Sequence, residues 1–139
     1  MKHILLDTSV VVALLDKGDG AHQRCMRVIQ DVTQPLSTCE AVITECCFLL
    51  DQVHGATAAV LANVQNGAFQ IRFRLHDSIL SVHELMHKYR DVPMSFADAC
   101  LVQMADELGT GDILTLDSDF LHYRWRKSRH FNLVIPLEE

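Results

Sequence analysis

Apolar positions recur along the chain with two different periods. Short apolar runs closed by an acid or a turn residue are typical of buried strands, whereas apolar residues three and four positions apart indicate amphipathic helices. By these criteria, strands are predicted at residues 2–7, 35–38, 69–75, 112–116 and 132–137. Helices are predicted at residues 10–16, 21–32, 39–53, 57–66, 77–90 and 95–108, with Thr8 and Ser9 as the expected N-caps of the first.

Strands that alternate with helices are typical of an α/β protein with a mostly parallel sheet and helices on both faces. The segment FQIRFRL, residues 69–75, alternates like an edge strand. With 139 residues and no internal repeat or linker, the chain is expected to form one domain, residues 1–139. Active sites of such sheets lie at the carboxyl ends of the strands, so the residues that follow each strand are the first to inspect.

Composition narrows the class of protein. Hydrophobic residues make up 49% of the chain and charged residues 22%, which is typical of a compact globular protein. The first apolar run is too short to span a bilayer and is interrupted by Asp7 and Asp16, so a cytoplasmic protein without a membrane segment is expected. The five cysteines are odd in number and form no C-x-x-C pair, which favours buried, reduced thiols.

Acidic residues occupy positions where an unpaired charge is costly. Asp7 and Asp117 end two predicted strands, and Glu45 and Asp98 lie on apolar helix faces. Any one of them alone has an ordinary structural role, such as a helix cap. Four such acids with no basic residue nearby in sequence suit a hard cation, Mg²⁺ or Mn²⁺. A cation held by carboxylates activates water and stabilises a leaving oxygen, which is nuclease chemistry.

Four stretches resemble the PIN domain, and their order is most similar to the VapC-type toxin ribonucleases of toxin–antitoxin pairs. They are ILLDTSVVVALL, ITECCFLL, KYRDVPMSFADACLVQMADELG and ILTLDSDF. The resemblance covers nearly the whole chain. It implies a three-layer α/β/α fold with a five-stranded, mostly parallel sheet, and a metal-dependent endoribonuclease activity. It also implies an RNA substrate, a protein antitoxin and a homodimer.

The resemblance also implies roles for individual residues. Asp7, Glu45, Asp98 and Asp117 would be the catalytic acids, with Asp7, Asp98 and Asp117 as ligands of Mg²⁺ or Mn²⁺. Asp119, Ser9 and Thr115 would have supporting roles beside the acidic pocket.

Basic residues gather in one segment of this acidic chain. The formal net charge is −6, yet HYRWRKSRH, residues 122–130, holds four basic residues and no acid. It is expected to contact RNA phosphates through its cations and to stack a base on Tyr123 or Trp125. The four cations are Arg124, Arg126, Lys127 and Arg129.

The segment HELMH, residues 83–87, fits the H-E-x-x-H pattern of zinc peptidases, with Glu107 as a formal third ligand. At helical spacing, however, His83 and His87 fall on the flank of the apolar face, towards solvent. A zinc site would also leave the four acids unexplained, so the motif is interpreted as accidental.

Three further alternatives belong to other classes. An aspartyl phosphatase needs an acid two residues after Asp7, where Ser9 stands, and a phospho-receiver domain needs a phosphoacceptor Asp that PLSTCE does not offer. A PIN fold that binds a partner without cleaving RNA stays open. Loss of cleavage on Asp98→Asn, with folding retained, separates an enzyme from such a scaffold.

Overall fold

The computed structural model describes residues 2–137 and contains a five-stranded parallel sheet. Its strands run in the order β3-β2-β1-β4-β7, and each neighbouring pair is parallel. The predicted α/β class is therefore confirmed. The strands are β1 (Ile4–Leu6), β2 (Leu36–Thr38), β3 (Phe69–Ile71), β4 (Asp112–Leu114) and β7 (Asn132–Leu133).

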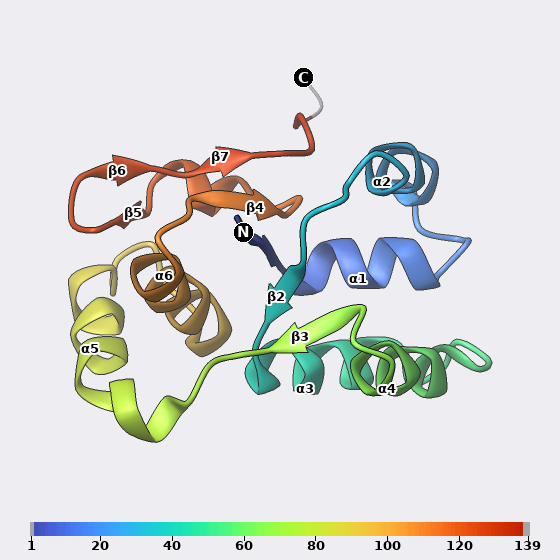
Figure 1. Ribbon diagram of the computed structural model, residues 1–139, viewed down its shortest axis with the longest axis horizontal. Coiled ribbons are helices and arrows are strands. Elements are labelled where there is room, and N and C mark those ends of the chain that lie inside the picture. Colours follow the sequence, from blue (N-terminus) through green and yellow to red (C-terminus); the bar gives the residue numbers. More distant parts are fainter. Residues whose placement is uncertain (1, 138–139) are drawn as a thin grey trace.

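Helices cover both faces of this sheet, which gives the three layers that were predicted. Figure 1 shows α5 and α6 on one side and α1, α2 and α4 on the other, while α3 packs against α1, α4 and α6. The helices are α1 (Thr8–Leu15), α2 (His22–Ile29), α3 (Glu40–Leu49), α4 (Ala56–Gln65), α5 (Leu75–Lys88) and α6 (Phe96–Leu108).

The central strands set the position of the acidic residues. Leu5 pairs with Ile113 and Leu6 with Leu114, and all four side chains are fully buried. The backbone amide of Asp7 then donates to the carbonyl of Leu114 at 3.0 Å. Because β1 and β4 are parallel, the residues that follow them emerge at the same edge of the sheet.

Several predicted boundaries are wrong: the strands predicted at 112–116 and 132–137 end at Leu114 and Leu133, and the helix predicted at 39–53 ends at Leu49. Asp7, not Thr8 or Ser9, is the N-cap of α1, because its carboxylate accepts the backbone amide of Thr8. The strand predicted at residues 69–75 ends at Ile71, and α5 begins at Leu75. β3 is an edge strand whose only partner, β2, is three residues long, so it has no hydrogen-bonding partner to extend it.

The basic segment contains a hairpin that the sequence did not predict, formed by β5 (Arg124–Trp125) and β6 (Arg129–His130). Arg126 and Lys127 adopt positive φ in its turn, a conformation usually signalled by Gly or Asn. The indole of Trp125 packs onto Gly111, where an added Cβ would lie 2.1 Å from the ring nitrogen. Between β4 and this hairpin lies a short 3₁₀ helix, η1 (Ser118–Leu121).

Candidate active site

The acids that were singled out from the sequence line one cavity of about 570 Å³. Asp7 follows β1, Asp117 follows β4 and caps η1, Glu45 lies in α3, and Asp98 lies in the first turn of α6. Four separate elements thus bring these carboxylates to the carboxyl edge of the sheet. Asp119, from η1, lines the same cavity.

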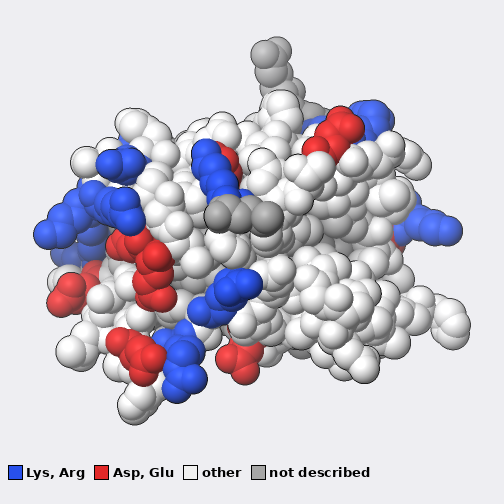
Figure 2. Space-filling view, viewed as in Figure 1, with Lys and Arg blue, Asp and Glu red and all other residues white. Residues whose placement is uncertain are grey.

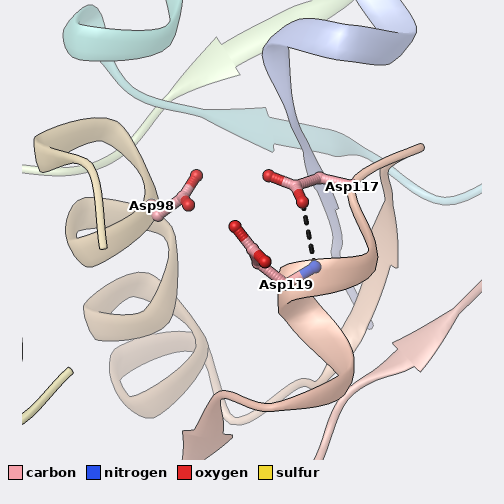
Figure 3. A group of neighbouring side chains, drawn as sticks. All are labelled: Asp98, Asp117 and Asp119. Carbon is pink, nitrogen blue, oxygen red and sulfur yellow. Dashed lines mark hydrogen bonds between the residues drawn. The ribbon is translucent and has the colours of Figure 1, made fainter. Parts of the chain in front are cut away.

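Three of the carboxylates form a tighter group. One oxygen each from Asp98, Asp117 and Asp119 lies within 4.8 Å of the others. Figure 3 shows the three side chains pointing toward one another, with the amide of Asp119 donating to Oδ1 of Asp117 at 2.9 Å. Asp119 therefore lies within the group of carboxylates, although only a supporting role was expected for it. The sequence feature that could have indicated this position is the spacing D-S-D at residues 117–119.

Asp7 lies deeper than that group and is held by its neighbours. Its Oδ2 accepts the hydroxyl of Thr115 at 2.6 Å and, at 3.4 Å, that of Ser9. Burial raises the pKa of Asp7 to about 7, the Thr115 hydroxyl opposes the rise, and the charge of Asp98 adds to it. Ser9 and Thr115 thus lie where the supporting roles would place them.

Asp98 is bound by a residue whose contribution was not predicted. The buried hydroxyl of Tyr123 donates to Oδ2 of Asp98 at 2.8 Å. Burial raises the pKa of Asp98 to about 6, the Tyr123 hydrogen bond lowers it, and the charge of Asp117 raises it. The pKa of Tyr123 is itself raised, first by burial and then by this bond, so its hydroxyl remains a donor. Ser95 caps α6 by accepting the amide of Asp98.

Glu45 is positioned by a short contact across two helices. The hydroxyl of Thr8, at the start of α1, donates to Oε1 of Glu45 at 2.6 Å. Thr8 was expected to cap the helix; instead it fixes the half-buried carboxylate that α3 points at the cavity.

The donor set fits a hard divalent cation. Among the described residues, no Lys or Arg lines the cavity, so no side-chain cation is placed to neutralise its carboxylates. Carboxylate oxygens are the ligands preferred by Mg²⁺ and Mn²⁺. Without such an ion, burial raises the pKa of both Asp7 and Asp98, and the charges of neighbouring acids add to the rise.

The basic segment lies outside this cavity. Lys and Arg gather over the β5–β6 hairpin, on the left of Figure 2. Arg124 and Lys127 line a separate hollow of about 330 Å³, and Arg126 is tied through its backbone amide to Asp106. Arg126 and Arg129 stack their guanidinium groups on Trp125. That these cations bind RNA stays a prediction.

The expectation that an aromatic ring of this segment stacks on a base is wrong. Tyr123 is 0% exposed and Trp125 is 7% exposed. Tyr123 packs edge-on against Tyr89 and Phe120, and the indole nitrogen of Trp125 donates to the carbonyl of His130. Both rings belong to the core, so neither has an exposed face on which a base could stack.

The HELMH motif forms no metal centre in the described part of the chain. His83 and His87 are exposed on α5 beside a shallow hollow that they share with Glu84 and Lys88. Glu107 instead accepts hydrogen bonds from Ser78 and Gln103. The interpretation of this motif as accidental agrees with the geometry.

All five cysteines are free, and four of them are buried, as expected. Across residues 2–137, no helix combines the length and the apolar character needed to cross a membrane.

Comparison with known families assigns the fold. The PIN domain family matches residues 4–126, which is most of the chain. The chain belongs to the PIN domain family. The resemblance that the four sequence stretches indicated is thereby confirmed.

This PIN domain is similar to a curated protein and to a solved structure. Ribonuclease VapC26 of Mycobacterium tuberculosis is 28% identical over 136 residues, which span 96% of this chain and 93% of the relative. The crystal structure of Mycobacterium tuberculosis VapC20, described as a sarcin–ricin loop cleaving toxin, superimposes with a TM-score of 0.80. It is 23% identical and the match covers 91% of this chain and 98% of VapC20, so it shows the fold.

Proposed function

We propose that this PIN domain is a metal-dependent endoribonuclease, and that residues 1–139 act as one domain. The observation that carries the proposal is the set of carboxylates from β1, α3, α6 and η1 around one cavity that no basic side chain of the described chain lines. The names of its relatives support the same reaction class, since one is a ribonuclease and the other an RNA-cleaving toxin.

Asp98, Asp117 and Asp119, whose oxygens lie close together, would hold the divalent cation, Mg²⁺ or Mn²⁺, and Asp7, which lines the same cavity, would be a further ligand. The chemistry that a bound divalent ion supplies is to polarise the phosphodiester, lower the pKa of the attacking water and stabilise the leaving oxygen. Asp98 is kept in position by the Tyr123 hydroxyl on its Oδ2, and Asp7 by the Thr115 hydroxyl on its own Oδ2. These two bonds fix the carboxylates before the substrate arrives, which limits the reorganisation needed during the reaction.

Glu45 completes the acidic wall of the cavity. Its Oε1 accepts the Thr8 hydroxyl, so Oε2 would be the oxygen that accepts a proton from a water molecule in the cavity. The cations of the hairpin, Arg124, Arg126, Lys127 and Arg129, bind RNA phosphates outside the cavity.

The cellular role follows from the relatives by the same reasoning. We propose that the chain acts as a toxin of the VapC type and that an antitoxin protein inhibits it. It would be a homodimer located in the cytoplasm. The names VapC26 and VapC20 support this role.

The decisive experiment is cleavage of a mixed RNA pool by purified wild type and Asp98→Asn. Each protein is assayed with Mg²⁺, with Mn²⁺ and with chelator, and its folding is checked by circular dichroism. Asp91→Asn, a change at an exposed aspartate outside the cavity, is the matched control. Cleavage that needs the metal and Asp98, but not Asp91, supports the nuclease. A folded, metal-loaded wild type that cuts no RNA contradicts it and favours a PIN scaffold.

A further inference from the structure

A large aromatic side chain stands in solvent at the acidic cavity. Phe48 lines the cavity and is 79% exposed, and its neighbour Leu49 also lines it and is 58% exposed. A scattered exposed hydrophobic residue is ordinary on a protein surface. Here two adjacent ones lie at a cavity lined by six acidic residues, and such a pair suits a ligand with an apolar face.

Helical spacing explains why this pair faces the cavity. Phe48 and Leu49 follow Glu45 by three and four residues on α3, so all three lie on one face of the helix. The Thr8 hydroxyl holds Glu45 against the start of α1, while Val42 and Cys46 mark the buried face of α3. The face that presents Glu45 to the metal site therefore presents Phe48 and Leu49 one turn further along.

Charge limits what can hold RNA at this point. The described residues that line the cavity include acids but no Lys or Arg, so its protein surface repels phosphate. The basic hairpin is outside the cavity, and its aromatic rings are buried. Stacking between a base and an aromatic ring does not depend on charge, and Phe48 is the aromatic side chain that lines this cavity.

We propose that Phe48 is the stacking platform for a nucleobase of the RNA substrate next to the scissile phosphate, with Leu49 extending the apolar contact. The inference rests on the proposed nuclease function and names the substrate group that its site recognises. A base paired within a duplex has both faces covered, so the base that Phe48 binds is unpaired, in a loop or a single strand.

Cleavage kinetics test the proposal first. Phe48→Ala should lower kcat/KM for a single-stranded RNA that wild type cuts by between about 5-fold and about 150-fold, the range expected from loss of one stacked base. Phe48→Trp should retain activity and Phe48→Leu should not, because stacking needs a ring. Leu80→Ala, at a comparably exposed residue on α5 outside the cavity, should leave kcat/KM unchanged.

A change in the RNA substrate complements the change in the protein. When the base beside the scissile phosphate is removed, leaving an abasic sugar, wild type should lose activity and Phe48→Ala should lose little more. Equal losses in both proteins would show that the ring and that base do not touch, and would overturn the proposal.

Binding is measured separately from cleavage. Phe48→Trp in an Asp98→Asn background places an exposed indole at the cavity, in addition to the buried Trp125. Titration with single-stranded homopolymers of each base, in Mg²⁺, should quench its emission in a saturable manner. The parent Asp98→Asn protein, with Trp125 alone, sets the background.

The outcomes separate the two proposals. If wild type cleaves RNA but Phe48→Ala cleaves equally well and the indole is not quenched, the stacking proposal fails and the nuclease stands. If no RNA is cleaved, the nuclease fails and the quenching titration alone decides whether Phe48 binds a base. If Phe48→Ala instead changes only the oligomeric state measured by light scattering, this face is a protein interface and the proposal is overturned.

Discussion

Replacing Asp7 by Asn should stabilise the metal-free protein. The buried Asp7 carboxylate has a pKa of about 7 in the folded chain, against an ordinary value of 3.8. At about 1.4 kcal/mol per pKa unit, ionisation of Asp7 costs the metal-free fold about 4 kcal/mol at pH 8. Asn removes this cost, keeps the side-chain oxygen that caps α1, and disturbs the Thr115 hydrogen bond at a cost of about 1 kcal/mol.

The net gain, about 3 kcal/mol at pH 8, has a defined pH dependence. Because the folded-state pKa is raised, the unfolded chain holds fewer protons than the folded chain between pH 3.8 and about 7. Wild type therefore loses stability relative to Asp7→Asn as pH rises through this window. As the pH falls below 3.8 the carboxyl becomes protonated in both states, and the advantage of Asn disappears.

Urea unfolding followed by circular dichroism, in chelator at pH 8 and at pH 4, measures the difference. In a thermal melt at pH 8, the same gain in the free energy of unfolding corresponds to a rise of about 10 °C in Tm for a chain of this size. Asp91→Asn, at an exposed aspartate, should change stability little at either pH. Mg²⁺ or Mn²⁺ should stabilise wild type more than Asp7→Asn, by mass action. If Asp7→Asn is no more stable than wild type at pH 8 in chelator, the electrostatic account of this site is refuted.

Three further predictions concern the hydrogen bond that holds Asp98, the packing of Trp125 and the basic hairpin. Tyr123→Phe removes the donor that lowers the pKa of Asp98, so the acid limb of the pH profile of kcat/KM should move to higher pH; an unchanged limb would separate Tyr123 from the reaction. Gly111→Ala should reduce the free energy of unfolding by about 2–4 kcal/mol, because the added Cβ meets the Trp125 indole. Gly20→Ala, where a Cβ meets nothing within 4 Å, should change stability much less in the same urea titration. Lys127→Ala should lower the slope of log K against log salt for single-stranded RNA by about 0.7. Lys17→Ala, at an exposed lysine outside the hairpin, should not, and equal slopes for both variants would exclude Lys127 from the RNA contact.

The carboxylates could be placed from sequence because two simple rules locate them. Parallel strands end at one edge of a sheet, which brings Asp7 and Asp117 together, and an acid on an apolar helix face must point at something that stabilises it, which applies to Glu45 and Asp98. Both rules need only local patterns. The positions of the acids were therefore predicted correctly even where the predicted ends of helices and strands were wrong by several residues.

The side chains that orient those acids could not be placed in this way. Tyr123 lies in a segment rich in Arg and Lys and appeared exposed, yet its ring is buried and its hydroxyl reaches Asp98, 25 residues earlier. That contact depends on how the hairpin packs against α6, which no periodicity along the chain reports. The closeness of Asp119 to Asp98 and Asp117 could not be predicted either, because it depends on the tight η1 turn that folds Asp119 back toward Asp117.

The strand order also fixes when the acidic site can exist during synthesis. β1 is the first strand made and lies at the centre of the sheet, but one of its two neighbours is β4, near the end of the chain. The hydrogen bond from Thr115 to Asp7 joins residues 108 positions apart, and Asp117 and Asp119 follow Thr115. A chain still held in the ribosome at that point has no complete set of carboxylates. The topology therefore makes the acidic site one of the last parts of the fold to assemble, because it needs the chain as far as Asp119.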